Sequence, residues 1–153
     1  MMKYIVLLFS LVLIACSNTQ GLTTAELNQA YRDYIAEQSL ESKDRVSSFK
    51  FRGWQTLTND FLILSSSPQK KYLVEVNGFC DELRYAQALI LNRSIASSLQ
   101  TRFDSIATPK MPNLKCFIKA IYPIDKQQAK AIAALDDQAT EPATENQVSP
   151  TQS

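Results

Sequence analysis

The first regular pattern of apolar residues along this chain has a helical period. Residues 23–42 read TTAELNQAYRDYIAEQSLES, and apolar side chains recur there every three or four positions at Leu27, Ala30, Tyr31, Tyr34 and Ile35. Thr23 followed by Glu26 fits a capping box. We therefore predict an N-terminal helix within residues 23–41. We expect its apolar stripe to pack on the rest of the domain; docking on a partner protein is the alternative.

From residue 46 the apolar period changes to two. FKFRGW (residues 49–54) alternates apolar and polar positions, which is typical of a half-buried strand, and Gly53 interrupts it, plausibly at a bulge. FLILS (61–65) and YLVEV (72–76) are two further predicted strands, separated by the turn signals TND (58–60) and SSPQKK (66–71). Two tight hairpins in a row predict an antiparallel meander.

The second half of this region predicts one helix and two more strands. Asp81 is placed to cap a helix over residues 82–91. TRFDSIAT (101–108) and LKCFIKAIYPID (114–125) are the fourth and fifth predicted strands, joined by the loop PKMPN. In the last strand Cys116, Ile118, Ala120 and Tyr122 are expected to share one face, and Pro123 to end it. A short helix is predicted over 125–136, and residues 137–153 should be disordered.

This order of elements predicts an α+β fold that is mostly β, with a β-rich domain over residues 46–136. Three strands, a crossover helix and two strands match the five-stranded, partly open barrel of the OB-fold. A five-stranded antiparallel sheet covered by one helix fits equally well, so both remain open.

The start of the chain predicts export. Residues 1–15 combine one lysine, a short apolar run and a small final residue, as in a signal peptide, and the run is too short to span a membrane. The ending Leu-Ile-Ala-Cys at 13–16 resembles a bacterial lipobox, which implies acyl chains on Cys16 and a lipidated tether over 16–22. Ser17, by the sorting rule of bacterial lipoproteins, implies the outer membrane, facing the periplasm. An ordinary signal peptide with a chance cysteine is the alternative.

Composition removes several classes of function. Without residues 1–15, the chain has 15 basic and 15 acidic residues, so it lacks the basic excess of nucleic-acid-binding proteins. The sequence contains no histidine, which excludes Ser-His-Asp and Cys-His catalysis and histidine-ligated zinc. No metal and no cofactor is predicted.

The remaining two thiols, Cys80 and Cys116, predict a disulfide, because exported proteins fold in an oxidising compartment. Closing a loop of about 36 residues contributes roughly 3 to 4 kcal/mol in the chain-entropy model. A redox-active pair is the alternative, but catalytic dithiols usually have Cys-x-x-Cys spacing.

The span from about 49 to 125 also resembles a proteobacterial family of small exported proteins, domain-of-unknown-function family 6491. The likeness rests on Gly53, Trp54, Leu57, Tyr72, Leu73, Cys80, Leu83, Ala86, Phe103, Asp104, Ile106, Cys116, Ile118, Ile121, Pro123 and Asp125. It implies an envelope location and a paired-cysteine domain, and it implies no activity.

Candidate functional residues are few. Trp54 and Tyr72, with Phe49 and Phe51, could form an aromatic platform for a ligand, although such residues at strand spacing are more often core. Arg52 is a candidate binding contact. Asp104 is a further candidate, and a strand or turn residue that pairs with Arg102 or Arg52 is the alternative interpretation.

We therefore expect a non-enzymatic binding or accessory module for an envelope protein or glycan. A hydrolase that uses the carboxylates Asp81, Glu82 and Asp104 is one alternative. A structural subunit that docks through its N-terminal helix is the other.

Overall fold

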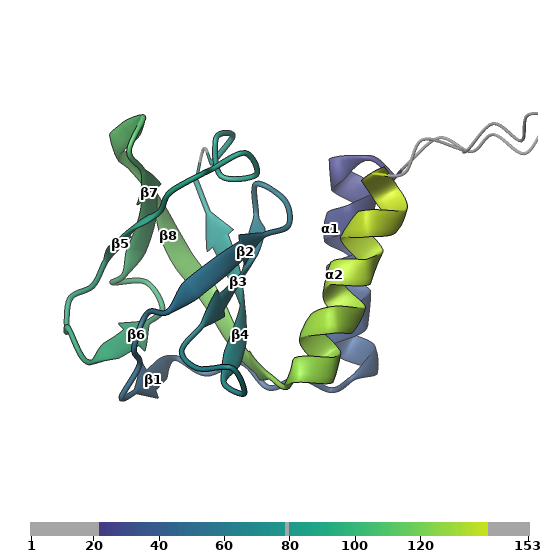
Figure 1. Cartoon of the computed structure of the whole chain (residues 1–153), viewed down its shortest axis with the longest axis horizontal. Helices are drawn as coiled ribbons and strands as arrows, with labels where there is room; N and C mark the ends of the chain where they lie inside the picture. The colour runs from purple at the N-terminus through teal and green to yellow at the C-terminus, as the bar shows by residue number, and fades with distance from the viewer. Residues whose placement is uncertain (1–21, 79, 141–153) are drawn as a thin grey trace, which may run out of the picture.

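The computed structural model describes residues 22–78 and 80–140, which form a curled antiparallel sheet and two helices (Figure 1). Six strands form the main sheet in the order β2-β3-β4-β8-β7-β5. Their bounds are β2 Gly53–Thr56, β3 Phe61–Ser65, β4 Lys71–Asn77, β5 Ile90–Asn92, β7 Ser105–Thr108 and β8 Met111–Ile124. β1 (Arg45–Ser47) and β6 (Ser98–Gln100) pair separately. The helices are α1 Thr24–Glu37 and α2 Lys126–Thr140.

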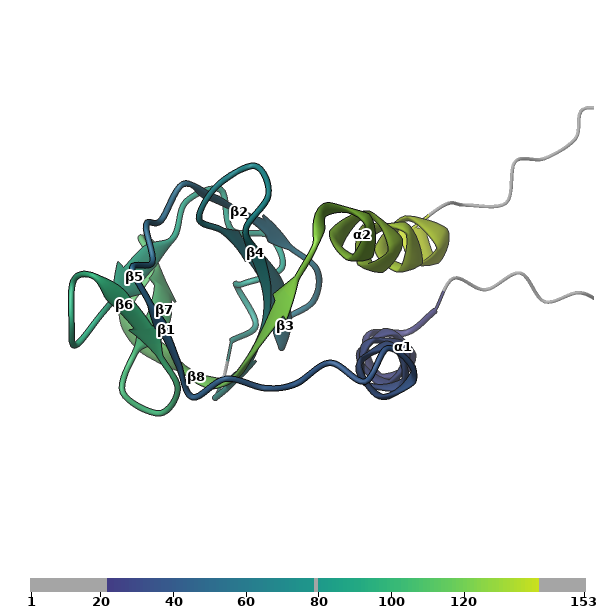
Figure 2. The ribbon, with the colours of Figure 1, turned by 90° about the horizontal axis from the view of Figure 1, so that it is seen from below.

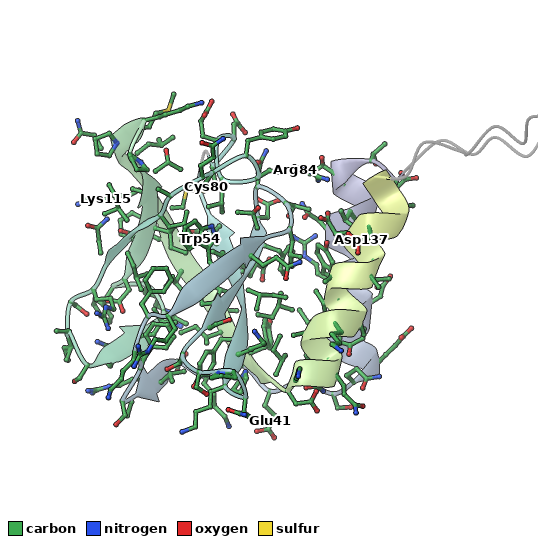
Figure 3. All side chains as sticks on the ribbon, in the orientation of Figure 1. Glu41, Trp54, Cys80, Arg84, Lys115 and Asp137 are labelled. Carbon is green, nitrogen blue, oxygen red and sulfur yellow. A yellow bond between two sulfur atoms is a disulfide. The ribbon has the colours of Figure 1, made fainter. Side chains whose placement is uncertain are left out.

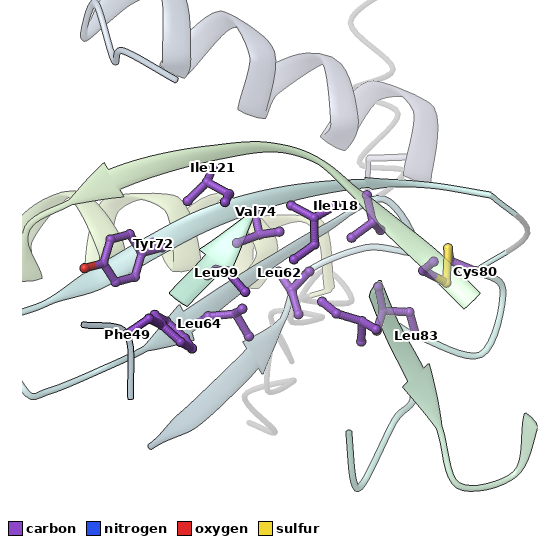
Figure 4. Close-up of a cluster of buried hydrophobic side chains, with 13 residues drawn as sticks. Phe49, Leu62, Leu64, Tyr72, Val74, Cys80, Leu83, Leu99, Ile118 and Ile121 are labelled. Atoms are coloured by element: carbon purple, nitrogen blue, oxygen red, sulfur yellow. A yellow bond between two sulfur atoms is a disulfide. The ribbon is translucent and has the colours of Figure 1, made fainter. Parts of the chain in front are cut away.

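The sheet curls into a half-barrel whose inside is a filled apolar core (Figures 2 and 4). Alternate residues of β3 and β4 point inward, as the period of two requires. The buried members are Phe49, Leu62, Leu64, Tyr72, Val74, Val76, Cys80, Leu83, Leu99, Ile106, Cys116, Ile118 and Ile121. The interior of this half-barrel is therefore occupied by side chains.

The two helices lie side by side on the outer face of β3 and β4 (Figure 2). The capping box predicted at Thr23 and Glu26 is confirmed. A second apolar cluster fills this layer: Leu27, Tyr31, Leu57, Phe61, Ile63, Leu73, Ile124, Ala129 and Ile132. The apolar stripe of α1 thus packs on the domain, as expected.

A polar network fixes α1 at the turn between β2 and β3. The buried Asn28 side chain donates to the Asp60 carboxylate, and the Thr58 hydroxyl donates to the side-chain oxygen Oδ1 of Asn28 at 2.6 Å. Thr58 Oγ1 also accepts from the Phe61 amide at 3.1 Å. The predicted TND turn therefore docks the helix as well as reversing the chain.

A β-bulge divides β8 into two parts. Val76 pairs with Ile118, whereas Glu75 pairs with Ala120, so Lys119 is an extra residue. Cys116 and Ile118 point into the half-barrel, but beyond the bulge Ile121 takes that direction and Tyr122 faces the helices. The expectation that Cys116, Ile118, Ala120 and Tyr122 share one face is wrong, because the inserted residue reverses the alternation.

The mostly-β α+β class is confirmed, but the sheet has six strands, not five, and the crossover helix is absent. Residues 80–89 form turns, and residues 90–92 form β5. The amide of Arg84 donates to the Asn59 side chain, and its carbonyl accepts from Thr56 Oγ1. Both backbone groups are thereby withdrawn from helical hydrogen bonding, so tertiary contacts override the weak helical pattern.

Three boundaries also differ from the predictions. Ser48 has a φ of 56°, which interrupts the extended backbone between β1 and residues 49–52. The predicted strand therefore begins only at Gly53, and its pairing with β3 shows no bulge there. Pro123 lies inside β8, opposite Tyr72. It is tolerated because β7 pairs with β8 only between Met111 and Phe117.

The C-terminal boundary is the third difference. α2 continues through residue 140, so residues 137–140 of the expected disordered tail are helical, and the rest of that tail lies outside the described residues. Neither α1 nor α2 is long and apolar enough to cross a bilayer, within the part of the chain that the structure describes.

Candidate functional site

The predicted disulfide between Cys80 and Cys116 is present. It joins the loop after β4 to β8, with the two Cα atoms 5.9 Å apart and both residues buried. Gly78, with a φ of 117°, turns the chain out of β4 toward this bond, a conformation that favours glycine. Cys16, the predicted lipidation site, lies outside the described residues.

Two of the predicted binding residues, Trp54 and Tyr72, come together on the inner face of the half-barrel. Both pair with Leu64, from opposite sides. Tyr72 meets Phe49 edge to face at 5.7 Å between ring centroids, and Trp54 stacks on Phe51 at 6.0 Å. Burial raises the pKa of Tyr72. These aromatic side chains are therefore part of the apolar core, and Trp54 at its edge is half-buried. Arg52, which precedes this strand, is exposed.

Asp104 is a structural residue. Its fully buried carboxylate accepts hydrogen bonds from the amide and the hydroxyl of Ser94 and from the amide of Gln100, each at 2.8 Å. The ion pairs among the described residues do not join it to Arg102 or Arg52. Asp104 therefore holds two loop segments together, and the expected arginine pairing is wrong.

The three carboxylates proposed for hydrolysis do not converge on one cavity. Glu82 pairs with Lys110 at 3.2 Å on the surface, and Asp81 is exposed. A cavity of about 290 Å³ lies between residues 82–88 and 108–110, and Asp104 does not line it. Across the described ranges, no cluster of acidic and cysteine side chains could hold a metal ion.

A different surface has the properties of a binding site. It lies on the outer face of the sheet, beyond the area that the helices cover, and it surrounds an open depression of about 520 Å³. We define the Phe103–Phe117 surface as Asn77, Arg102, Phe117 and Lys119, which line the depression, together with two exposed residues close to them in the chain, Phe103 and Lys115. Phe103 is 73% exposed and Phe117 is 43% exposed. Exposed apolar side chains at a surface depression are typical of interaction sites.

Backbone geometry places these side chains. Lys115, Phe117 and Lys119 alternate on the exposed face of β8, and Phe117 pairs with Asn77 on β4 and Ser105 on β7. Phe103 lies two residues before Ser105, so its ring comes from the chain entering the neighbouring strand. Figure 3 shows Lys115 at the end of the molecule farthest from the helices.

Arg102 adopts a conformation that favours glycine, with a φ of 68°. Its amide donates to the carbonyl of Ile118 at 2.7 Å, and the Ile118 amide donates to the carbonyl of Asp104 at 3.0 Å. Such backbone strain costs about 1 kcal/mol or more and tends to occur at functional sites. The strained turn is thus hydrogen-bonded to β8, and the exposed Phe103 follows it in the chain.

Charge is unevenly distributed between the sheet and the helices. Residues 45–124 contain 11 Lys and Arg against 5 Asp and Glu, whereas residues 22–44 and 125–140 together contain 4 against 8. Lys119 pairs with the buried Glu75 at 2.9 Å. Arg102 and Lys115 have no ion-pair partner among the residues that the structure describes. The balanced total charge conceals a basic sheet beside acidic helices.

The sequence-based predictions did not identify this surface, although one signal was available. If Cys116 and Ile118 face inward, alternation leaves Phe117 outward between two lysines. The available signal is therefore Phe117 itself, because an apolar aromatic residue is unusual on the polar face of a strand. That Arg102 and Phe103 lie beside it depends on the tertiary structure.

Comparisons with known proteins add one match. A family model, described as a family of unknown function (DUF6491), matches residues 1–141. No curated protein and no solved structure matches the chain.

Proposed function

Taking as a premise that this chain belongs to the DUF6491 family, whose function is unknown, we propose that it is an outer-membrane lipoprotein facing the periplasm. In this proposal acyl chains on Cys16 anchor it, and the folded domain acts as a non-enzymatic binding module for an anionic partner in the cell envelope. The support for the anchor is the Leu-Ile-Ala-Cys sequence at 13–16 after a charged start and an apolar run. Several acyl chains on one residue give firm membrane attachment.

The anchor has a direct test. Mass spectrometry of the mature protein should show a chain that begins at Cys16 and carries the added mass of acyl groups. A Cys16→Ser variant should lose this mass and appear in the soluble envelope fraction. A chain that begins elsewhere, or an unmodified Cys16 thiol, would contradict the anchor.

The Phe103–Phe117 surface is the single observation that carries the binding role. The exposed Phe117 and Arg102 line an open depression, and the exposed Phe103 follows Arg102 in the chain. Arg102 and Lys115 lack a carboxylate partner in the described chain. Apolar area supplies affinity, and unpaired cations select a partner of opposite charge. Exposed apolar side chains that are not needed for packing are typical of sites that a partner covers.

Site-specific photo-crosslinking in intact cells tests this role. The photoreactive residue p-benzoylphenylalanine replaces Phe103 or Phe117 in the full chain, and replaces Tyr85 as a control, since Tyr85 is an aromatic residue that is 77% exposed elsewhere. We expect discrete adducts from positions 103 and 117 that disappear when Arg102→Glu and Lys115→Glu are combined. The absence of adducts at these two positions, or equal adducts at position 85, would refute the binding role.

A further inference from the structure

We infer that the Phe103–Phe117 surface binds an extended acidic polypeptide segment, in which carboxylates flank one apolar side chain at a spacing of two residues. This inference rests on the proposed binding role and specifies the class of partner. It is argued from the charge, the chemistry of the rings and the place of the surface in the fold.

The spacing follows from β8. Lys115 and Phe117 are two residues apart on one face of a strand, and a strand rises about 3.3 Å per residue, so the cation and the ring lie about 7 Å apart along it. An extended segment running along β8 would present every second side chain to this face with the same spacing. A carboxylate facing Lys115 then places the side chain two residues further on against Phe117.

The number of free cations sets the charge of the segment. Lys119 already pairs with Glu75, whereas Arg102 and Lys115 are exposed and without a carboxylate within the described ranges. Arg102 can grip a carboxylate with two parallel hydrogen bonds. Arg102 lies in the turn before β7 and Lys115 lies on β8, two residues from Phe117, so the two cations would hold two separate carboxylates.

The rings favour a polypeptide over a glycan. Both aromatic residues of the surface are phenylalanine, which offers apolar area and no hydrogen-bonding group. Sugar rings present several hydroxyl groups, which Tyr and Trp can satisfy and Phe cannot. An aliphatic side chain matches two phenylalanines without leaving a polar group unpaired.

The location argues against the anchoring membrane as the occupant. Figures 1 and 2 show that α1 begins at the helical end of the molecule and that β7 lies at the opposite end. In the proposed function the tether to Cys16 precedes α1, whereas Lys115 of the surface lies at the end of the molecule farthest from the helices (Figure 3). A partner in the periplasmic space reaches this surface more readily than the bilayer does.

Binding measurements on the purified, acylated full chain in detergent micelles test the inference. The probe is the peptide Gly-Glu-Ser-Leu-Ser-Glu-Gly, and matched peptides replace both Glu by Gln or the Leu by Ser. Two further probes are vesicles of phosphatidylglycerol and soluble muropeptides. Chemical shifts of the backbone amides locate the contact. Lys50→Glu and Tyr85→Ala are control variants, because they change an exposed basic residue and an exposed aromatic residue outside the surface.

We expect the Glu-Leu-Glu peptide to shift the amides of residues 102–104 and 115–119, and to bind at least about tenfold more tightly than either matched peptide. Phe117→Ala and Arg102→Glu should each abolish that preference, and the two control variants should retain it. Binding of muropeptides or vesicles at these residues in place of the peptide would overturn the inference and leave the proposed binding role intact. Failure of every probe would also overturn it, while the crosslinking experiment separately decides the binding role.

Discussion

The outer face of the curled sheet has two halves that differ in what covers them. Over β3, β4 and the end of β8, Phe61, Leu73 and Ile124 are buried beneath α1 and α2. Over β7 and the first half of β8, Phe117 is 43% exposed on a face that also presents Lys115 and Lys119. One strand, β8, contributes to both halves, and the Lys119 bulge marks the boundary.

The difference shows which apolar residues the fold itself requires. The covered half is closed by side chains of the same chain, so its apolar residues are explained by stability. The uncovered half has apolar residues, unpaired cations and a strained Arg102, and none of these contributes to the core. An exposed apolar side chain and a strained backbone do not stabilise the core, and binding to a partner is the most direct explanation for them.

Alanine substitutions should separate the two halves most strongly. Phe61→Ala should lower the free energy of unfolding by about 3 to 5 kcal/mol, because it empties a fully buried site between α1 and the sheet. Phe117→Ala should change it by about 1 kcal/mol or less, because this side chain is 43% exposed and belongs to neither apolar cluster. Urea denaturation of both variants measures the difference. Equal losses would mean that Phe117 is a core residue.

Removing the disulfide should weaken the uncovered half first. Combining Cys80→Ala with Cys116→Ala opens a loop with a sequence separation of 36 residues, which should cost about 3 to 4 kcal/mol. Amide hydrogen exchange should accelerate in residues 80–89 and in β7 more than in α1 and α2. Uniform acceleration along the chain would show that the bond stabilises both halves alike.

The boundary between the halves should respond asymmetrically to loss of charge. Glu75 is buried, with its side chain 8% exposed, whereas its partners Arg32 and Lys119 are 46% and 54% exposed. Combining Arg32→Ala with Lys119→Ala leaves a buried carboxylate without a cation and should cost about 2 to 3 kcal/mol, after allowance for solvent screening. Glu75→Gln leaves two cations that water can solvate and should cost about 1 kcal/mol or less. Equal costs in urea denaturation would contradict this asymmetry.

Local sequence signals predicted the elements that depend on neighbouring residues. The capping box at Thr23, the strands over 61–65 and 72–76, the helix after Asp125 and the cysteine pair are all confirmed. Each depends on a period or a cap within a short window, or on two cysteines that have only each other as partners in the domain.

The remaining features depend on contacts between distant segments. The bulge at Lys119 arises where β8 crosses from the half-barrel interior to the helical layer, and one residue of register decides which side chains are buried. The loop over 80–89 is held by Asn59 and Thr56, which lie on another hairpin. The Phe103–Phe117 surface likewise joins residues from two strands and a strained turn, so no single window of sequence contains it.

The smallest expected effect on the free energy of unfolding concerns Tyr31, in the covered half. Its hydroxyl is fully buried and has no hydrogen-bond partner among the described residues, so Tyr31→Phe should stabilise the protein by about 1 kcal/mol near neutral pH.

Burial, followed by the charge of Asp136, raises the pKa of Tyr31 above its ordinary value. The unfolded chain therefore loses this proton first, and stability should fall as the pH rises above about 10. Tyr31→Phe should reduce that alkaline loss, and Tyr85→Phe, a change at an exposed site, should not. Urea titrations at neutral and alkaline pH measure both effects, and a less stable Tyr31→Phe variant at neutral pH would show that the hydroxyl is bonded after all.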